Sequence, residues 1–154
     1  MRQLLVLLAC LLPVISQANT LSVNKPRIML DAKHNRDEFR IFNPTKEFQT
    51  YRLGIIDMQM DELGNINEVE SLEHSARQLL RVGPRMGKNI APDLYQSFRV
   101  MLKRKGLEQG EFRSHILMES LLPPAEENQG VVVRPNIRYS IPVIIRHGDL
   151  NAIF

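Results

Sequence analysis

Histidine, serine and carboxylate side chains are the groups in this sequence that could do acid–base or nucleophilic chemistry, and their spacing assembles no site. The four histidines lie in separate segments without the spacing of metal ligands: His34, His74, His115 and His147. Ser114 and His115 are adjacent, but neighbours on a strand point to opposite faces and cannot act as nucleophile and base. We therefore predict that the chain is not an enzyme and that it uses no metal or other cofactor.

The most distinctive pattern is the stretch GVVVRPNIRYSIPVIIRHG, residues 130–148. Apolar residues occupy every odd position from Val131 to Ile145, and most even positions are polar or turn-forming. This alternation predicts a β-strand with one apolar face. About fifteen residues at about 3.3 Å each would reach roughly 50 Å, whereas ordinary strands have about 3–10 residues. The predicted strand is longer than the core of a small domain can cover.

The first 18 residues have the pattern of a secretory signal peptide. Arg2 precedes an apolar run, and the small residues Ser16 and Ala18 mark a cleavage site after Ala18. The apolar run is shorter than the roughly 20 residues that a membrane-spanning helix needs. A lipoprotein signal that is cleaved before Cys10 is the alternative. We predict an exported protein that does not insert into a membrane once the signal is removed.

Composition agrees with one exported domain that folds without disulfides. Cleavage after Ala18 leaves 136 of the 154 residues, enough for one hydrophobic core. The only cysteine, Cys10, leaves with the signal. The net charge of +3 is close to balanced, and the one basic cluster, residues 103–105, is smaller than a nucleic-acid site needs. We therefore predict no nucleic-acid partner.

After the signal, short apolar-faced segments alternate with turns, and no segment has a sustained helical period. Strands are expected at residues 21–30, 38–45, 51–60, 78–84, 93–103, 111–121 and 131–145. Pro26 interrupts the first segment, as is tolerated where a strand bends between sheets. This pattern predicts an all-β fold, a seven-stranded antiparallel immunoglobulin-like β-sandwich over residues 19–148. A small closed barrel is the alternative.

Five stretches, in this order, carry a resemblance to a known family: KPRIMLDA (25–32), FRIFNPT (39–45), LLRVGPRMGKNIAPDLYQSFRVML (79–102), GEFRSHILMESLLPP (110–124) and YSIPVIIRHG (139–148). Together they resemble the amino-terminal immunoglobulin-like domain of the PapD-like periplasmic chaperones of the chaperone–usher pilus assembly pathway. The resemblance implies a periplasmic location. It also implies that residues 149–154 begin a linker to a second domain, which this sequence lacks.

The resemblance gives the long last strand a function. Such chaperones lend this strand to a pilus subunit whose own sandwich lacks one, before the subunit reaches an outer-membrane usher. A donated strand satisfies an open sheet edge and inserts alternate side chains into an apolar groove. The implied donor residues are Val131, Val133, Pro135 and Ile137, whereas residues 139–145 would belong to the chaperone's own core. The alternative is an exported structural or adhesive module that self-associates through the same edge.

The family also holds the carboxyl terminus of the subunit with two basic residues. The first corresponds to Arg27, whose guanidinium could grip a carboxylate through two parallel hydrogen bonds. The second, a lysine in the family, falls on Pro142. Either Arg138 or Arg146 is the second basic residue that binds the subunit's carboxyl terminus, or the chain anchors its client with Arg27 alone.

Overall fold

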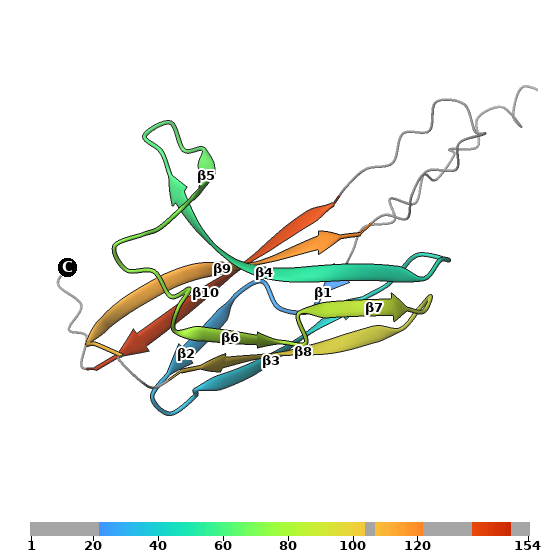
Figure 1. Cartoon of the computed structure of the whole chain (residues 1–154), viewed down its shortest axis with the longest axis horizontal. Helices are drawn as coiled ribbons and strands as arrows, with labels where there is room; N and C mark the ends of the chain where they lie inside the picture. The colour runs from blue at the N-terminus through green and yellow to red at the C-terminus, as the bar shows by residue number, and fades with distance from the viewer. Residues whose placement is uncertain (1–21, 104–106, 122–136, 149–154) are drawn as a thin grey trace, which may run out of the picture.

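The computed structural model describes residues 22–103, 107–121 and 137–148, which form two β-sheets packed face to face (Figure 1). The predicted signal peptide, the residues after Gly148 and the predicted donor residues Val131, Val133 and Pro135 lie outside these ranges. The described ranges contain strands and no helix, so they offer no helix that could cross a membrane.

The first sheet has four strands in the order β1-β3-β8-β6, and every pairing in it is antiparallel. Its strands are β1 (Ser22–Val23), β3 (Arg36–Phe42), β8 (Tyr95–Leu102) and β6 (Leu80–Gly83). Phe39 of β3 and Phe98 of β8 are register partners, and their rings stack with centroids 5.5 Å apart.

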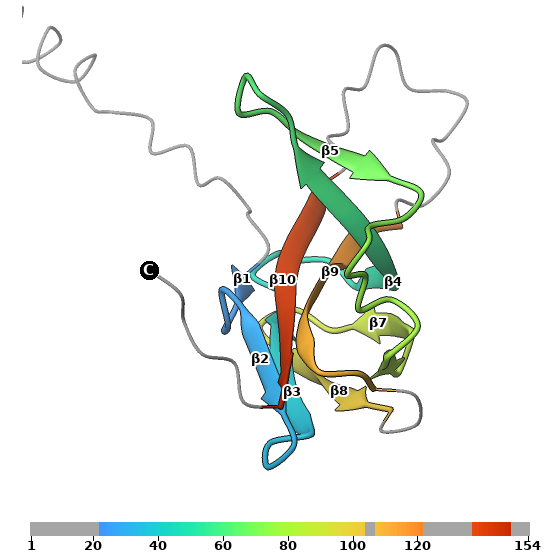
Figure 2. The same ribbon diagram turned by 90° about the vertical axis from the view of Figure 1, so that its left-hand side faces the viewer.

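The second sheet has the order β2-β10-β9-β4, and β4 pairs with two further strands on its far side. The strands are β2 (Ile28–Asp31), β10 (Arg138–His147), β9 (Gly110–Ser120), β4 (Gln49–Met60), β5 (Ile66–Val69) and β7 (Met86–Ile90). The first residues of β4 pair with β7, and its last residues pair with β5. The β4–β5 hairpin stands out from the sandwich in Figures 1 and 2.

The immunoglobulin-like β-sandwich is confirmed, and the separate sheets exclude the closed barrel, but the strand count and pairing differ from the prediction. The structure describes ten strands instead of seven, and β2 pairs with β10 in parallel. The predicted segment 21–30 divides between the sheets at residues 24–27, around Pro26, which has no N–H to give to a ladder. The chain passes between the sheets again from β6 to β7, and β7 lies where no strand was expected, between the predicted segments 78–84 and 93–103.

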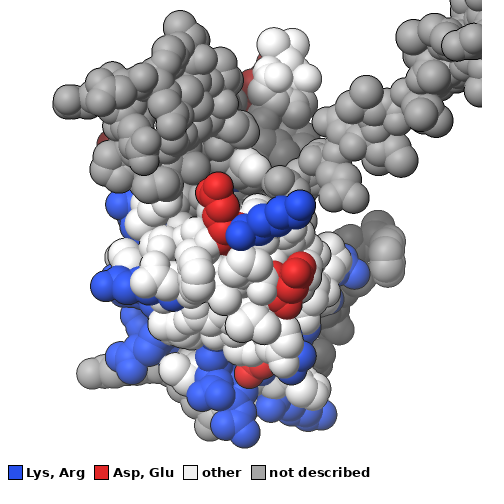
Figure 3. Space-filling view, turned by 90° about the vertical axis from the view of Figure 1, so that its right-hand side faces the viewer, with Lys and Arg blue, Asp and Glu red and all other residues white. Residues whose placement is uncertain are grey.

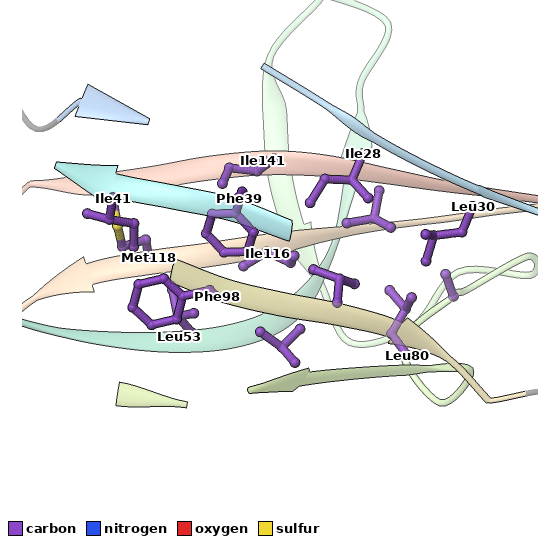
Figure 4. Close-up of a cluster of buried hydrophobic side chains, with 14 of the residues drawn as sticks. Ile28, Leu30, Phe39, Ile41, Leu53, Leu80, Phe98, Ile116, Met118 and Ile141 are labelled. Atoms are coloured by element: carbon purple, nitrogen blue, oxygen red, sulfur yellow. The ribbon is translucent and has the colours of Figure 1, made fainter. Parts of the chain in front are cut away.

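The core lies between the sheets and contains alternate residues of the long strands (Figure 4). Its largest fully buried side chains include Tyr51, Phe39, Phe98, Ile28, Leu30, Ile41, Ile116 and Met118. The expected apolar face of residues 93–103 is confirmed for Phe98, Val100 and Leu102. Leu94, which the same alternation places on this face, lies instead in a turn before β8 and is 57% exposed. Alternation applies only where the backbone is extended.

Asn43 stabilises the turn that follows β3. Its side chain is fully buried, and its Nδ2 donates to the carbonyls of Glu47 and Ile90. Its Oδ1 accepts from the N–H and the hydroxyl of Thr45. A buried amide with all of these partners avoids the desolvation penalty of an unpaired group and fixes the end of β3 against β7.

Charged residues of both signs are exposed on the described surface. At the end of the molecule seen in Figure 3, Lys and Arg side chains lie mainly around the margin, with a few Asp and Glu side chains and uncharged surface between them. Several charges are also neutralised locally, because Lys25 pairs with Asp37 and Arg40 with Glu38.

Candidate functional site

The candidate site is the edge of β10 that faces away from β9. β10 pairs with β9 from Arg138 to His147, but it pairs with β2 only from Val143 to Arg146. Figure 2 shows β2 along the lower part of β10 only. Within the described residues, the segment from Arg138 to Pro142 therefore has a strand on one side and an open edge on the other.

Hydrogen-bond directions identify which backbone groups face this open edge. The Ser120 N–H donates to the Ile137 carbonyl at 3.2 Å, so the polar groups of Ile137 face β9. Backbone groups alternate sides along an antiparallel strand, so the groups of Arg138 and Ser140 face the open edge. Pro142 also faces away from β9, and its missing N–H therefore removes no bond from the β9–β10 ladder.

Side chains of β10 follow the predicted alternation. Ile141, Val143 and Ile145 are 0% exposed, and Tyr139 packs partly buried against the core. These residues belong to the protein's own core, as the sequence predicted. Ile137, the one predicted donor residue within the described ranges, directly precedes β10 and is only partly buried.

Arg27 lies where the open edge ends. It directly precedes β2, and the register of Ile28 with Val143 places it beside Pro142. Its side chain is exposed and makes no hydrogen bond or ion pair with the described residues. A guanidinium in this position is available to a carboxylate that arrives along the edge.

Arg138, a candidate second anchor, is already engaged with carboxylates of the same chain. Its Nη2 lies 3.4 Å from Glu68 Oε2, and its Nε lies 4.0 Å from Glu119 Oε1. Glu119 also pairs with Arg52 at 2.5 Å. Arg52, followed by Arg138, holds the pKa of Glu119 below its usual value. The backbone of Arg138 faces the open edge, but its guanidinium shares its charge with two acids.

Arg146, the other candidate, lies at the opposite end of β10 and is in register with Asp31 of β2. Its Nε donates to Glu111 Oε2 at 2.7 Å. This bond, together with that from Arg113, lowers the pKa of the Glu111 carboxyl. Of the three arginines, Arg27 is therefore the one with no carboxylate partner in the described part of the chain.

A buried polar cluster around Asp57 was not predicted. Asp57 is 1% exposed and accepts hydrogen bonds from the hydroxyls of Ser114 at 2.5 Å and Ser75 at 2.7 Å. Two charge-assisted bonds offset part of the cost of burying a carboxylate. The only sequence signal is an acidic residue at the end of the apolar run LGII. We assign the cluster a structural role in joining β4, β9 and the segment before β6.

His115 does not join this cluster. Ser114 points into the core and His115 lies beside it on the strand, so the two side chains face opposite sides, as predicted. The buried Nδ1 of His115 has no hydrogen-bond partner among the described residues. Burial lowers the pKa of His115, and the charge of Asp57 opposes that shift. No group of His, Cys, Asp or Glu in the described ranges could hold a metal ion.

No family model and no curated protein matches the sequence, but solved structures match the fold. The chaperone–tip adhesin complex of CFA/I fimbriae biogenesis matches with a TM-score of 0.66 and 15% identity over 86% of this chain and 58% of that one. The class 5 fimbriae chaperone CfaA matches with a TM-score of 0.62 and 16% identity, over 86% and 58% of the two chains. This is the PapD-like chaperone fold.

A third PapD-like neighbour is the pre-assembly complex of CsuC with the tip adhesion subunit CsuE, from the archaic chaperone–usher Csu pili of Acinetobacter baumannii. Its TM-score is 0.58 at 18% identity, over 83% of this chain and 57% of that one. The chain thus spans less than two thirds of the chaperone chains it matches. These neighbours are described as chaperones and not as enzymes, in agreement with the prediction that this chain is not an enzyme.

The PapD-like fold also occurs outside pilus assembly. A PapD-like domain of human CEP192 matches with a TM-score of 0.54 and 11% identity, and the match covers 86% of this chain and 88% of that domain. Function therefore has to be argued from the open edge of β10 and the residues around it, and not from the fold.

Proposed function

We propose that the protein is a periplasmic chaperone that stabilises pilus subunits by pairing its last strand with an edge of the subunit, and then delivers them to an outer-membrane usher. The observation that carries the proposal is the open edge of β10 from Arg138 to Pro142, which ends at the unpaired Arg27. The fold neighbours in complex with an adhesin or a pilin support subunits as partners.

In the proposed complex, the incoming strand lies on the same edge of β10 as β2. Arg138 and Ser140 each offer one N–H and one C=O to it. Because β2 occupies the edge from Ile28 onward, the incoming strand ends at Arg27. If its carboxyl terminus lies there, the strand runs parallel to β10, as β2 does. The Arg27 guanidinium then binds the terminal carboxylate, a charge-assisted contact worth about 1.5–3 kcal/mol.

The donor side chains in this proposal are Val131, Val133, Pro135 and Ile137, which continue the odd-numbered, inward-facing series of β10. Four such side chains buried in a groove would contribute about 1.5–3 kcal/mol each, or roughly 6–12 kcal/mol before ordering costs. If the alternation continues, the missing N–H of Pro135 falls on the side away from the client. Pro135 would then break no bond to the subunit.

Co-expression with a pilus subunit tests the proposal. We expect wild-type protein to yield a soluble one-to-one complex and the variants Val133→Asp and Ile137→Asp to lose it, because an aspartate cannot enter an apolar groove. Ile66→Asp is the matched control, because Ile66 is exposed on β5, which pairs with β4 and not with β10. Normal client binding by both donor variants would refute the donor assignment.

A structural or adhesive module that self-associates through the same edge remains the second candidate. This second function is supported by the occurrence of the same fold in a domain of human CEP192, outside pilus assembly. Such a module forms oligomers that grow with concentration and needs no subunit. Light scattering of the isolated protein, with and without a candidate subunit, separates the two functions.

A further inference from the structure

We propose that a groove on the far edge of β4 binds a short, extended, acidic peptide segment. The groove has a volume of about 460 Å³ and is lined by residues 53–56 of β4, Leu80 and Val82 of β6, and the side chains of Arg77, Arg85 and Lys103. β9 separates β4 from β10 in the sheet, so this groove is distinct from the open edge of β10. The inference does not depend on the function proposed above.

Unpaired backbone groups of β4 face the groove. On this side β4 pairs with β7 as far as Arg52 and with β5 from Asp57 onward, which leaves a gap at residues 53–56. The Leu53 N–H donates to the Arg85 carbonyl at 2.8 Å, so the odd-numbered residues of β4 turn their polar groups to this side. Ile55 thus presents an N–H and a C=O without a strand partner among the described residues.

The side chains around this gap are cationic. Arg77 and Arg85 are exposed and form no ion pair with the described residues. Lys103 donates to the Gln78 carbonyl at 3.0 Å, and its ammonium has two further donors. No carboxylate of the described residues lines the groove, so its potential is positive.

Arg85 and Lys103 contribute most to this potential. Arg77 also lines a neighbouring hollow that carries Glu70, Glu73 and Glu108, and these acids offset its charge. Arg85 is therefore the residue to substitute in a test of the groove. A change of its side chain leaves its backbone carbonyl free to accept the bond from the Leu53 N–H.

The combination of groups selects a peptide over a small anion. A phosphate or a single carboxylate would use the cations and the Ile55 N–H, but it would face the adjacent Ile55 carbonyl, which repels it. A peptide in extended conformation donates to that carbonyl and accepts from the N–H, as in strand addition to a sheet edge. Acidic side chains on such a peptide then reach the guanidinium and ammonium groups.

Fluorescence anisotropy with a labelled peptide of alternating valine and glutamate tests the inference on the full chain at low salt. We expect saturable binding that Arg85→Gln weakens about tenfold, because one charge-assisted contact is lost. Arg81→Gln is the matched control: Arg81 lies on β6 between the buried Leu80 and Val82 and is exposed on the opposite face. We expect this control to bind like wild type and a valine–glutamine peptide to bind much more weakly.

NMR resolves where the peptide binds, since β10 also has an open edge. Peptide-induced shifts of the Ile55 amide support the groove. Shifts of the Ser140 amide without those of Ile55, equal binding of the glutamine peptide, or equal losses in Arg81→Gln and Arg85→Gln would overturn the proposal. Full competition by inorganic phosphate at concentrations similar to the peptide would reduce the groove to a simple anion site and would overturn it too.

Discussion

At the scale of single residues, Arg27 and Pro142 define how the open edge of β10 ends. Pro142 occupies the position at which the resemblance expects a second cation. The backbone nitrogen at this position, which carries no hydrogen in proline, faces away from β9. Arg138 and Arg146 are each held by carboxylates of β9. The residues therefore favour an anchor of one arginine, with Arg138 as a neighbour whose charge is largely neutralised.

Replacement of Arg27 tests this anchor. We expect Arg27→Gln to weaken the binding of a pilus subunit about tenfold, because the charge-assisted bond to the terminal carboxylate is lost. Arg36→Gln, at an exposed position on β3, should leave binding unchanged. Titration of a subunit into each variant gives the affinities. Equal affinities of Arg27→Gln and wild type would remove Arg27 from the site.

His115 gives the fold a pH dependence of its own. Because its pKa is lower in the folded protein than in the unfolded chain, the unfolded chain takes up a proton first as the pH falls below about 6.5. Stability is therefore lost as the pH falls through the range between the unfolded and folded pKa values. Glu111 and Glu119 have lowered pKa values and act in the same direction, but only below about pH 4.5.

Urea unfolding at about pH 7 and about pH 5.5 measures this effect. We expect the loss of stability between the two values to be smaller in His115→Leu than in wild type. His34→Gln is a suitable control, because His34 is exposed and hydrogen-bonds to Asp31 at the surface. An unchanged pH dependence in His115→Leu would contradict the assignment.

At the scale of elements, period-two alternation predicts strands well and their ends poorly. Alternation places the buried residues of β8, β9 and β10 correctly because each strand has one face on the core. It does not show where the chain leaves one sheet for the other: β1 and β2 share one alternating segment, and β7 was missed because its buried and exposed residues do not alternate. Asp57 was missed because its partners Ser75 and Ser114 are distant in sequence.

A pair of variants on and beside β8 tests where the alternation stops. Phe98→Ala should lower the free energy of unfolding by about 3–5 kcal/mol, because it removes a fully buried ring that stacks on Phe39. Leu94→Ala should change it by no more than about 0.5 kcal/mol, since Leu94 is largely exposed. Chemical denaturation of both variants measures the difference. Similar losses would place Leu94 in the core after all.

The backbone of β10 permits a test that separates folding from client binding. Ser140→Pro removes an N–H that faces the open edge, so we expect a stability change of at most about 1 kcal/mol and about tenfold weaker subunit binding. Ile141→Pro removes an N–H that faces β9 and should destabilise the fold itself. Thermal unfolding should therefore show a large loss of stability only in Ile141→Pro. Ser140→Pro should stay folded and bind the subunit more weakly. Strong destabilisation by Ser140→Pro alone would show that this N–H is used within the protein.

At the scale of the whole molecule, the architecture is more predictable than the site. The sandwich follows from strand patterns that every segment carries, and the solved structures share it at 10–18% identity. The site depends on the absence, among the described residues, of a strand beside residues 138–142 of β10, and no local pattern encodes such an absence. The groove on β4 has the same origin, because it lies in a gap between two partners of one strand. Residue patterns predict what packs together, whereas open edges appear only once the topology is known.

The parallel pairing of β2 with β10 has one further consequence. β2 occupies the edge of β10 from Ile28 onward. A client strand that runs parallel to β10 along this edge therefore cannot continue past Arg27. A segment from the middle of a folded chain would collide there, whereas a chain that finishes at that point fits. If a client strand pairs with β10 as proposed, this obstruction favours a strand that ends at Arg27 over one that continues past it.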